Sequence, residues 1–148
     1  MSALRFRNID ASPDDPVETW PFEGVRTALE RGTLPDWRRL AQAIGADPWG
    51  AVAQQVLEAV DLSRPYGTAE LFQGVVNRAR VAAAEAERQE VAAEIRSLVA
   101  ASRLSRQEFA ERIGTSRTRL STYMSGKVTP SASLMIRMRR VSGAVSRS

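Results

Sequence analysis

Apolar residues recur three and four positions apart along most of the chain, which is the spacing of one face of an α-helix. In residues 21–66 the pattern is interrupted at Gly32 and again between Gly45 and Pro48, where helices commonly stop and start. We therefore expect a small domain of three helices over residues 21–66. Its aromatic side chains should lie in the core. For Trp49 we favour burial in the core, and the alternative is exposure to a partner.

The residues before this domain follow no helical pattern. Residues 1–20 hold few periodic apolar positions and a turn-rich stretch at 10–16. We expect an irregular N-terminal arm over 1–20 that folds back on the helices through Phe6, Ile9 and Trp20.

A long helical pattern comes next. Nothing in residues 68–101 stops a helix except Gly74, which costs only about 1 kcal/mol. We expect a connector helix over 67–90 that is fused to the first helix of a C-terminal domain. The sequence leaves open whether the helix bends near Gln89. This stretch carries a stripe of small residues, Ala79, Ala82, Ala83 and Ala86. Such a stripe suits close contact with another helix, either within the monomer or between the two chains of a homodimer.

Two short helices joined by a tight turn are predicted over residues 104–126. Ser105 can cap the first helix, with Glu108 completing a capping box. Gly114 tolerates the positive φ at which that helix stops, and Ser116 can cap the second helix. The residues predicted to face inward are Phe109, Ala110, Ile113, Leu120 and Tyr123.

Residues 143–148 are expected to be a disordered tail. Before this tail, a last helix is predicted after its N-cap, Ser131. Its apolar face would hold Leu134, Met135, Met138 and Val141, while Arg137, Arg139 and Arg140 should be solvated, with phosphate contact open to one or two. The expected fold is all-α: an N-terminal three-helix unit, a long connector helix and a helix-turn-helix domain over residues 91–142.

Basic charge is concentrated at the C-terminal end. Residues 1–66 carry seven Arg against ten acidic residues, a net charge of −3, and residues 67–94 carry −2. Residues 95–148 hold ten Arg and one Lys against two Glu, a net charge of +9. An excess of this kind around a helix-turn-helix is typical of phosphate binding.

The composition also restricts the chemistry. The chain has no Cys and no His, so it lacks the usual nucleophile–base pairs and zinc ligands. We expect no enzyme activity, no cofactor and no metal. No apolar run reaches the length of a bilayer, and no signal peptide is evident, so we expect a cytoplasmic protein without a membrane partner. Carboxylate catalysis through Asp14, Asp15 and Glu18 is disfavoured, because no companion base accompanies them.

Residues 104–131 resemble the Cro/Xre, lambda-repressor-like family, whose pattern is Leu-Thr-Gln-x-x-Leu-Ala-x-x-Leu-Gly-x-Ser-x-x-x-Ile-Ser-x-x-x-x-Gly-x-x-x-Pro-Ser. The resemblance covers residues 90–142. Arg106 stands where the family usually has Gln, with Gln107 beside it. Met124 and Ser125 precede Gly126, where the family commonly has Glu or Asn.

This resemblance implies that the second motif helix enters the major groove of DNA. The residues then expected at base edges are Ser116, Arg117, Thr118, Ser121 and Thr122. Among them Arg117 is the best candidate for a bidentate contact with guanine. Those expected at phosphates are Arg106, Gln107, Arg119 and Lys127.

A shorter segment with a similar sequence, which we call the echo of the motif, lies upstream. Residues 40–45, Leu-Ala-Gln-Ala-Ile-Gly, repeat the form of Phe109–Gly114. The segment after Gly45 offers acidic and apolar groups where a DNA-reading helix would offer Arg, Ser or Thr. We interpret the echo as shared helix packing and not as a second DNA-binding site.

The predicted function is a sequence-specific DNA-binding transcriptional regulator, most simply a homodimeric repressor whose partner is double-stranded DNA. The alternative is an antitoxin, which would bind a toxin protein through its N-terminal region and repress its own operon.

Overall fold

A computed structural model describes residues 4–146 of the chain. All regular elements within these residues are helices and none is a strand, which confirms the predicted all-α fold. The chain divides into two compact units, Met1–Ala83 (unit 1) and Ala84–Ser148 (unit 2). Helix α4, Thr68–Ser102, has its first turns in unit 1 and its last turns in unit 2. It is assigned as one helix, without a break at Gln89.

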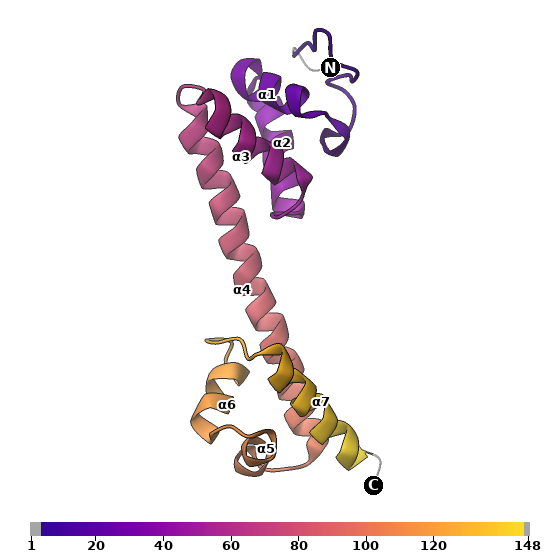
Figure 1. Cartoon of the computed structure of the whole chain (residues 1–148), viewed down its shortest axis with the longest axis vertical. Coiled ribbons are helices and arrows are strands. Elements are labelled where there is room, and N and C mark those ends of the chain that lie inside the picture. The colour runs from indigo at the N-terminus through magenta and orange to yellow at the C-terminus, as the bar shows by residue number, and fades with distance from the viewer. Residues whose placement is uncertain (1–3, 147–148) are drawn as a thin grey trace. The chain divides into compact units, whose positions relative to one another are not determined.

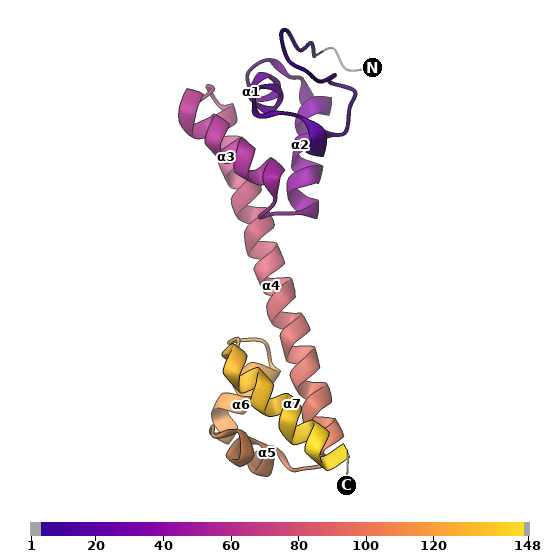
Figure 2. The ribbon, with the colours of Figure 1, turned by 45° about the vertical axis from the view of Figure 1, so that its right-hand side comes forward.

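Unit 1 is built on three helices that pack with the start of α4 (Figures 1 and 2). They are α1 (Phe22–Arg31), α2 (Leu34–Ala46) and α3 (Ala51–Ser63). Apolar residues at helical spacing fill their common core, as the sequence predicts: Val25, Leu29, Leu40, Ile44, Val52, Val56, Val60 and Phe72. The three-helix N-terminal unit is therefore confirmed.

The arm before α1 packs on this core. Trp20 is buried, and the Phe6 ring meets it edge-on with ring centroids 5.2 Å apart. Leu4 and Val17 are also buried, and Val17 opens the short 3-10 helix η1, Val17–Thr19. The fold-back through Phe6 and Trp20 is as predicted, whereas no sequence pattern indicates the burial of Leu4 and Val17.

The prediction that the aromatic side chains of this unit lie in the core is wrong for Trp49 and for Tyr66, which is fully exposed. Trp49 is 49% exposed and sits in the turn between α2 and α3. The Arg80 guanidinium lies over its ring, 5.9 Å from the centroid, and Arg80 Nε donates a hydrogen bond of 2.9 Å to the Pro48 carbonyl. A cation over one face stabilises an aromatic ring that solvent still reaches, so burial is not required.

The bounds of α2 differ at both ends from those that the sequence predicts, which are a start at Pro35 and an end at Gly45. The helix begins at Leu34, because the Asp36 carboxylate accepts hydrogen bonds from the backbone N–H and the hydroxyl of Thr33, at 2.9 and 3.1 Å. It continues through Gly45 to Ala46. Gly45 therefore does not end the helix, unlike Gly114 in the motif that it echoes.

In unit 2 the end of α4 packs with α5 (Arg106–Ile113), α6 (Arg117–Met124) and α7 (Ala132–Ser146), as Figures 1 and 2 show. Their core confirms the predicted inward-facing residues: Ile95, Phe109, Ala110, Ile113, Leu120, Leu134, Met135 and Met138 are buried, and Tyr123 and Val141 are half-buried against them. Helix α7 continues to Ser146, so residues 143–146 are helical and the prediction of a disordered tail is wrong for them. Residues 147–148 lie outside the described residues.

Candidate DNA-binding surface

The turn between α5 and α6 is fixed by its backbone. Gly114 adopts φ +81°, and its N–H donates to the Glu111 carbonyl, while the N–H of Thr115 donates to the Ala110 carbonyl at 2.9 Å. This pair of bonds is the Schellman arrangement, which satisfies the last carbonyls of a helix and needs a left-handed residue. Gly114 therefore ends α5 as predicted and reverses the chain into α6.

Serine residues cap both motif helices. Ser105 Oγ accepts the N–H of Glu108, and Ser116 Oγ accepts the N–H of Arg119, each at 3.1 Å. Both caps satisfy backbone donors that have no partner inside the helix. The N-cap predictions for Ser105 and Ser116 are confirmed. The predicted capping box is not, because the Glu108 carboxylate does not accept a hydrogen bond from the Ser105 N–H.

Helix α6 has one buried and one exposed face. Leu120 is fully buried and Met124 nearly so. Arg117, Thr118 and Ser121 are exposed. Ser121 follows Thr118 by three residues and Arg117 by four, which places the three on one face of the helix. An exposed face of Arg, Thr and Ser without a carboxylate is suited to an anionic, hydrogen-bonding partner.

The structure distinguishes the remaining residues expected at bases. Ser116 is exposed, and because its oxygen accepts the capping bond, its hydroxyl hydrogen is left to donate. Thr122 is half-buried, and its Oγ1 donates to the Arg119 carbonyl at 2.6 Å. Its hydroxyl hydrogen is therefore committed to the backbone, while its methyl group is not.

The four residues expected at phosphates, Arg106, Gln107, Arg119 and Lys127, are all exposed. Arg106 and Gln107 lie in the first turn of α5, where Gln107 Nε2 donates to Glu111 Oε1 at 2.9 Å. The N–H of Lys127 donates to the Thr122 carbonyl at 3.1 Å, which fixes the backbone directly after α6.

Gly126 makes that ending possible. It adopts φ +81°, and its N–H donates to the Tyr123 carbonyl at 3.3 Å. A Cβ at this position would lie only 2.6 Å from Gln89 Nε2 of α4. The left-handed backbone therefore favours glycine at 126, whereas the exposed Gln89 side chain is free to move away from a Cβ.

Two arginines outside the motif hold the ends of the motif helices. Arg96 Nη1, from α4, donates to the Met124 carbonyl at the end of α6, at 2.6 Å. Arg137 Nη1, from α7, donates to the Ile113 carbonyl at the end of α5, at 3.3 Å. Cations at helix C-termini interact favourably with the last carbonyls and the helix dipole. No sequence pattern pairs residues so far apart along the chain, so neither role is visible in the sequence.

The three arginines of α7 are exposed, as expected for solvated side chains, and two of them, Arg137 and Arg139, also have partners in the fold. Arg139 Nε forms an ion pair of 2.9 Å with Glu94 Oε1, and this hydrogen bond raises the pKa of Arg139. In α4 the hydrogen bond from Arg88, followed by that from Gln89, lowers the pKa of Glu85.

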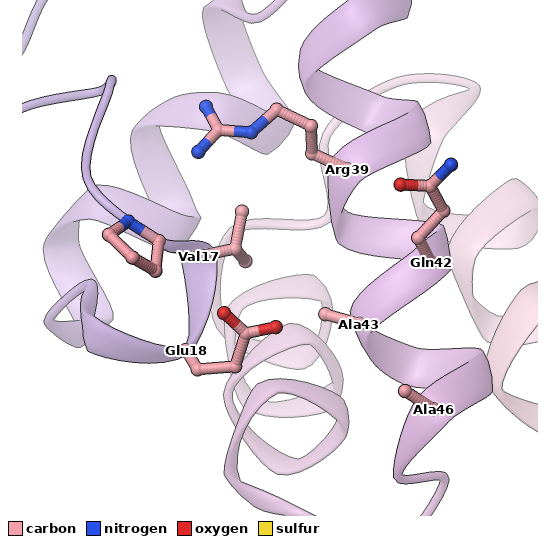
Figure 3. A pocket seen from close by; sticks show the side chains of 7 residues that line it. Val17, Glu18, Arg39, Gln42, Ala43 and Ala46 are labelled. Carbon is pink, nitrogen blue, oxygen red and sulfur yellow. The ribbon is translucent and has the colours of Figure 1, made fainter.

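Two of the carboxylates considered for catalysis, Asp15 and Glu18, have different surroundings. Asp15 Oδ2 accepts the N–H of Ser12, at 2.9 Å. Glu18 lines a small pocket of about 260 Å³ together with Arg39 and Gln42. Figure 3 shows the side chains that line this pocket. The Arg39 guanidinium donates hydrogen bonds to the backbone carbonyls of Pro13 and Asp15.

Metal sites and membrane spans are both missing from the described part of the chain. No group of three or more acidic side chains there could hold a metal ion. None of its helices is long and apolar enough to cross a membrane.

Comparison with known proteins gives one match. Residues 90–147 match the family model of a helix-turn-helix domain. No curated protein and no solved structure matches the chain. The match covers the end of α4 and all of α5, α6 and α7, and it agrees with the resemblance seen in the sequence. The match and the arrangement of α5 and α6 together identify residues 90–147 as a helix-turn-helix domain.

Proposed function

We propose that this protein is a sequence-specific transcriptional regulator that reads the major groove with α6. The observation that carries the proposal is the exposed face of α6, on which Arg117, Thr118 and Ser121 lie opposite the buried Leu120. In a helix-turn-helix, the N-terminal residues of the second helix contact base edges. The net charge of +9 over residues 95–148 supports binding to phosphates around that helix.

The proposed contacts with DNA divide between base edges and the phosphate backbone. Arg117 would bind guanine through two hydrogen bonds, and Thr118, Ser121 and the free hydroxyl hydrogen of Ser116 would reach neighbouring base edges. Thr122 would contact a thymine through its methyl group, because its hydroxyl hydrogen is used by the Arg119 carbonyl. The exposed Arg106, Gln107, Arg119 and Lys127 would bind phosphates and set the register.

We further propose that the regulator acts as a homodimeric repressor of the Cro/Xre type. Two-fold symmetric proteins of this kind bind two half-sites about one helical turn apart. Two members of the alanine stripe, Ala82 and Ala86, are exposed, which supports a helix–helix contact between two copies. A repressor of this kind would act in the cytoplasm, where it meets its operator, without a cofactor or catalytic step.

Selection of bound sites from a random duplex pool tests this function. The expected result is one enriched motif that occurs as two inverted half-sites, with a centre-to-centre spacing of about 10 base pairs. Recovery of unenriched sequence would contradict specific recognition. A single, unrepeated half-site would leave recognition intact and contradict the dimer.

A second candidate function is that of an antitoxin, and exposed apolar side chains in unit 1 favour it. Leu62 at the end of α3, Tyr66 in the following turn and Leu71 in α4 are 66%, 103% and 46% exposed. Exposed apolar residues of this size suit a protein partner. A neighbouring gene for a small toxin, and loss of complex formation on Tyr66→Ser with Leu62→Ser, would support this candidate. An isolated gene would count against it.

A further inference from the structure

A second pocket in unit 1 is lined largely by arginine. It encloses about 290 Å³ and is lined by Arg5, Arg7, Glu23, Arg26, Thr27, Glu30 and Arg31. Four of the seven arginines in residues 1–66 thus surround one pocket, although that segment carries a net charge of −3. Gathering like charges costs free energy unless an opposite charge compensates it.

Alternation along the arm builds one wall of the pocket. Leu4 is buried and Phe6 packs on the core, whereas Arg5 and Arg7 are exposed. Side chains two apart in an extended segment point to the same side, so burial of Leu4 and Phe6 turns Arg5 and Arg7 outward together. A Cβ on Gly24 would lie 3.2 Å from the Phe6 ring, so glycine lets the arm approach α1 closely.

The polar face of α1 forms the other wall. Its five lining positions follow the spacing of one helical face, opposite the buried Val25, Ala28 and Leu29. Arg26 interacts with both acidic members of this face, through Nε with Glu30 at 3.2 Å and through Nη1 with Glu23 at 4.0 Å. The two glutamates are therefore directed at one of the four arginines.

Three cations remain without a carboxylate. Arg5, Arg7 and Arg31 are exposed, and none of them forms an ion pair within residues 4–146. Four Arg and two Glu leave the pocket with a net charge of +2. Guanidinium groups present paired N–H donors that match phosphate oxygens, and a phosphate monoester carries about −1.5 to −2 at pH 7.

We propose that this pocket binds a small phosphate-bearing molecule, whose phosphate is held by Arg5, Arg7 and Arg31. The charge of the pocket matches a phosphate dianion. Its volume suits a small molecule and not a macromolecular surface. The proposal does not depend on DNA binding by unit 2, and in a regulator the pocket would serve as an effector site.

Calorimetric titration of the full-length protein with glycerol 3-phosphate and with inorganic phosphate, at constant ionic strength, tests the proposal. Saturable binding of either probe with a Kd below about 10 mM is expected, and glycerol should not bind. The tighter of the two probes tells an ester from the free ion. Absence of saturable binding by both probes would overturn the proposal.

A double variant locates the site. Arg5→Gln with Arg7→Gln should weaken probe binding by about tenfold or more, because each exposed side chain is expected to contribute hydrogen bonds to the phosphate and not to the core. The matched control, Arg38→Gln with Arg64→Gln, removes the same charge from exposed arginines of unit 1 that do not line the pocket. Equal losses in both double variants would show non-specific attraction and overturn the proposal.

Two further measurements separate phosphate binding at the pocket from a loss of folding and from contact with DNA. The thermal unfolding midpoint of each double variant without probe should match that of the parent, so that a loss of binding is not a loss of folding. Duplex DNA of random sequence, added at saturation, should leave the probe affinity unchanged. Displacement of the probe by DNA would identify the arginines as a DNA-backbone contact and overturn the small-molecule site.

Discussion

At the scale of single residues, unit 2 uses its arginines in three different ways. Arg117 is exposed on the face of α6 and free to meet a base. Arg96 and Arg137 instead donate to the carbonyls that end α6 and α5. Arg139 pairs with Glu94. The high positive charge of this unit is therefore not uniformly available to DNA, which makes the individual arginines separable by mutation.

Arg117→Ala should remove discrimination at one base pair of the operator. A bidentate Arg–guanine contact discriminates by about 1–3 kcal/mol, so specific affinity should fall by that amount while weak non-specific binding persists. Gel-shift titration against operator and scrambled duplexes checks this. Arg140→Ala, an exposed arginine outside the motif helices, serves as the control. An unchanged ratio of the two affinities would contradict the role given to Arg117.

Lys127→Ala should act on every sequence alike. A lysine that contacts phosphate adds to affinity through counterion release, so its loss should lower the slope of log affinity against log salt by about one unit. Measuring binding to operator and random duplex over a series of salt concentrations checks this. A loss confined to the operator would instead place Lys127 at a base.

Arg96→Ala should weaken the attachment of α6 to α4. The variant leaves the Met124 carbonyl without its charged donor, and we expect the free energy of unfolding to fall by about 1 kcal/mol. Chemical denaturation with Arg96→Lys as the conservative comparison tests it. Because Arg96 holds the end of α6, operator affinity should fall more in Arg96→Ala than in Arg96→Lys. Equal affinity in the two variants would contradict a positioning role.

At the scale of elements, the two echoing segments differ in how their helices end. α5 stops at Gly114 in a left-handed conformation, whereas α2 continues through Gly45 to Ala46. The same run of apolar residues and glycine therefore leads to two different endings. The difference lies downstream: Thr115 donates back to Ala110 after Gly114, while α2 is followed by Asp47 with φ −146°.

Alanine substitutions at the two glycines should therefore change stability in opposite directions. Gly114→Ala puts a Cβ into a left-handed residue and should destabilise by about 1–2 kcal/mol. Gly45→Ala places a methyl group in open space within a helix and should stabilise by about 0.5–1 kcal/mol. Denaturant titration of both variants checks the two signs. A destabilising Gly45→Ala would show that the close of α2 depends on glycine after all.

At the scale of the whole molecule, the two compact units carry net charges of opposite sign. Unit 1 holds nine Arg against eleven acidic residues, a net charge of −2, and unit 2 holds twelve basic residues against six acidic ones, a net charge of +6. Each unit has its own buried core. Attraction to a polyanion is therefore concentrated in the unit that carries the helix-turn-helix.

The fragment 84–148 should accordingly retain DNA binding, and the fragment 1–83 should lack it. At low salt we expect the first to shift duplex DNA with a strong salt dependence, because its excess charge releases counterions. The second should not shift DNA at the same concentrations. Circular dichroism of each fragment serves as the control for folding. Binding by 1–83 would revive a second DNA-binding segment at residues 40–45.

Much of this architecture can be read from the order of residues alone. Helical spacing of apolar residues, serines at N-caps and Gly114 at the turn are local features, because backbone hydrogen bonds and φ preferences act over a few residues. The helix-turn-helix, its buried Phe109, Ile113 and Leu120, and the exposed face of α6 all follow from such short-range rules.

Only the tertiary structure decided which side chains meet across the fold. It brought Arg96 to Met124, Arg137 to Ile113 and Arg80 over Trp49, and it gathered Arg5 and Arg7 beside Arg31. These contacts join residues 24 to 31 positions apart, and no periodic pattern specifies such pairs. The physical reason is that a charged or aromatic side chain takes whichever partner the packing of the apolar core leaves within its reach.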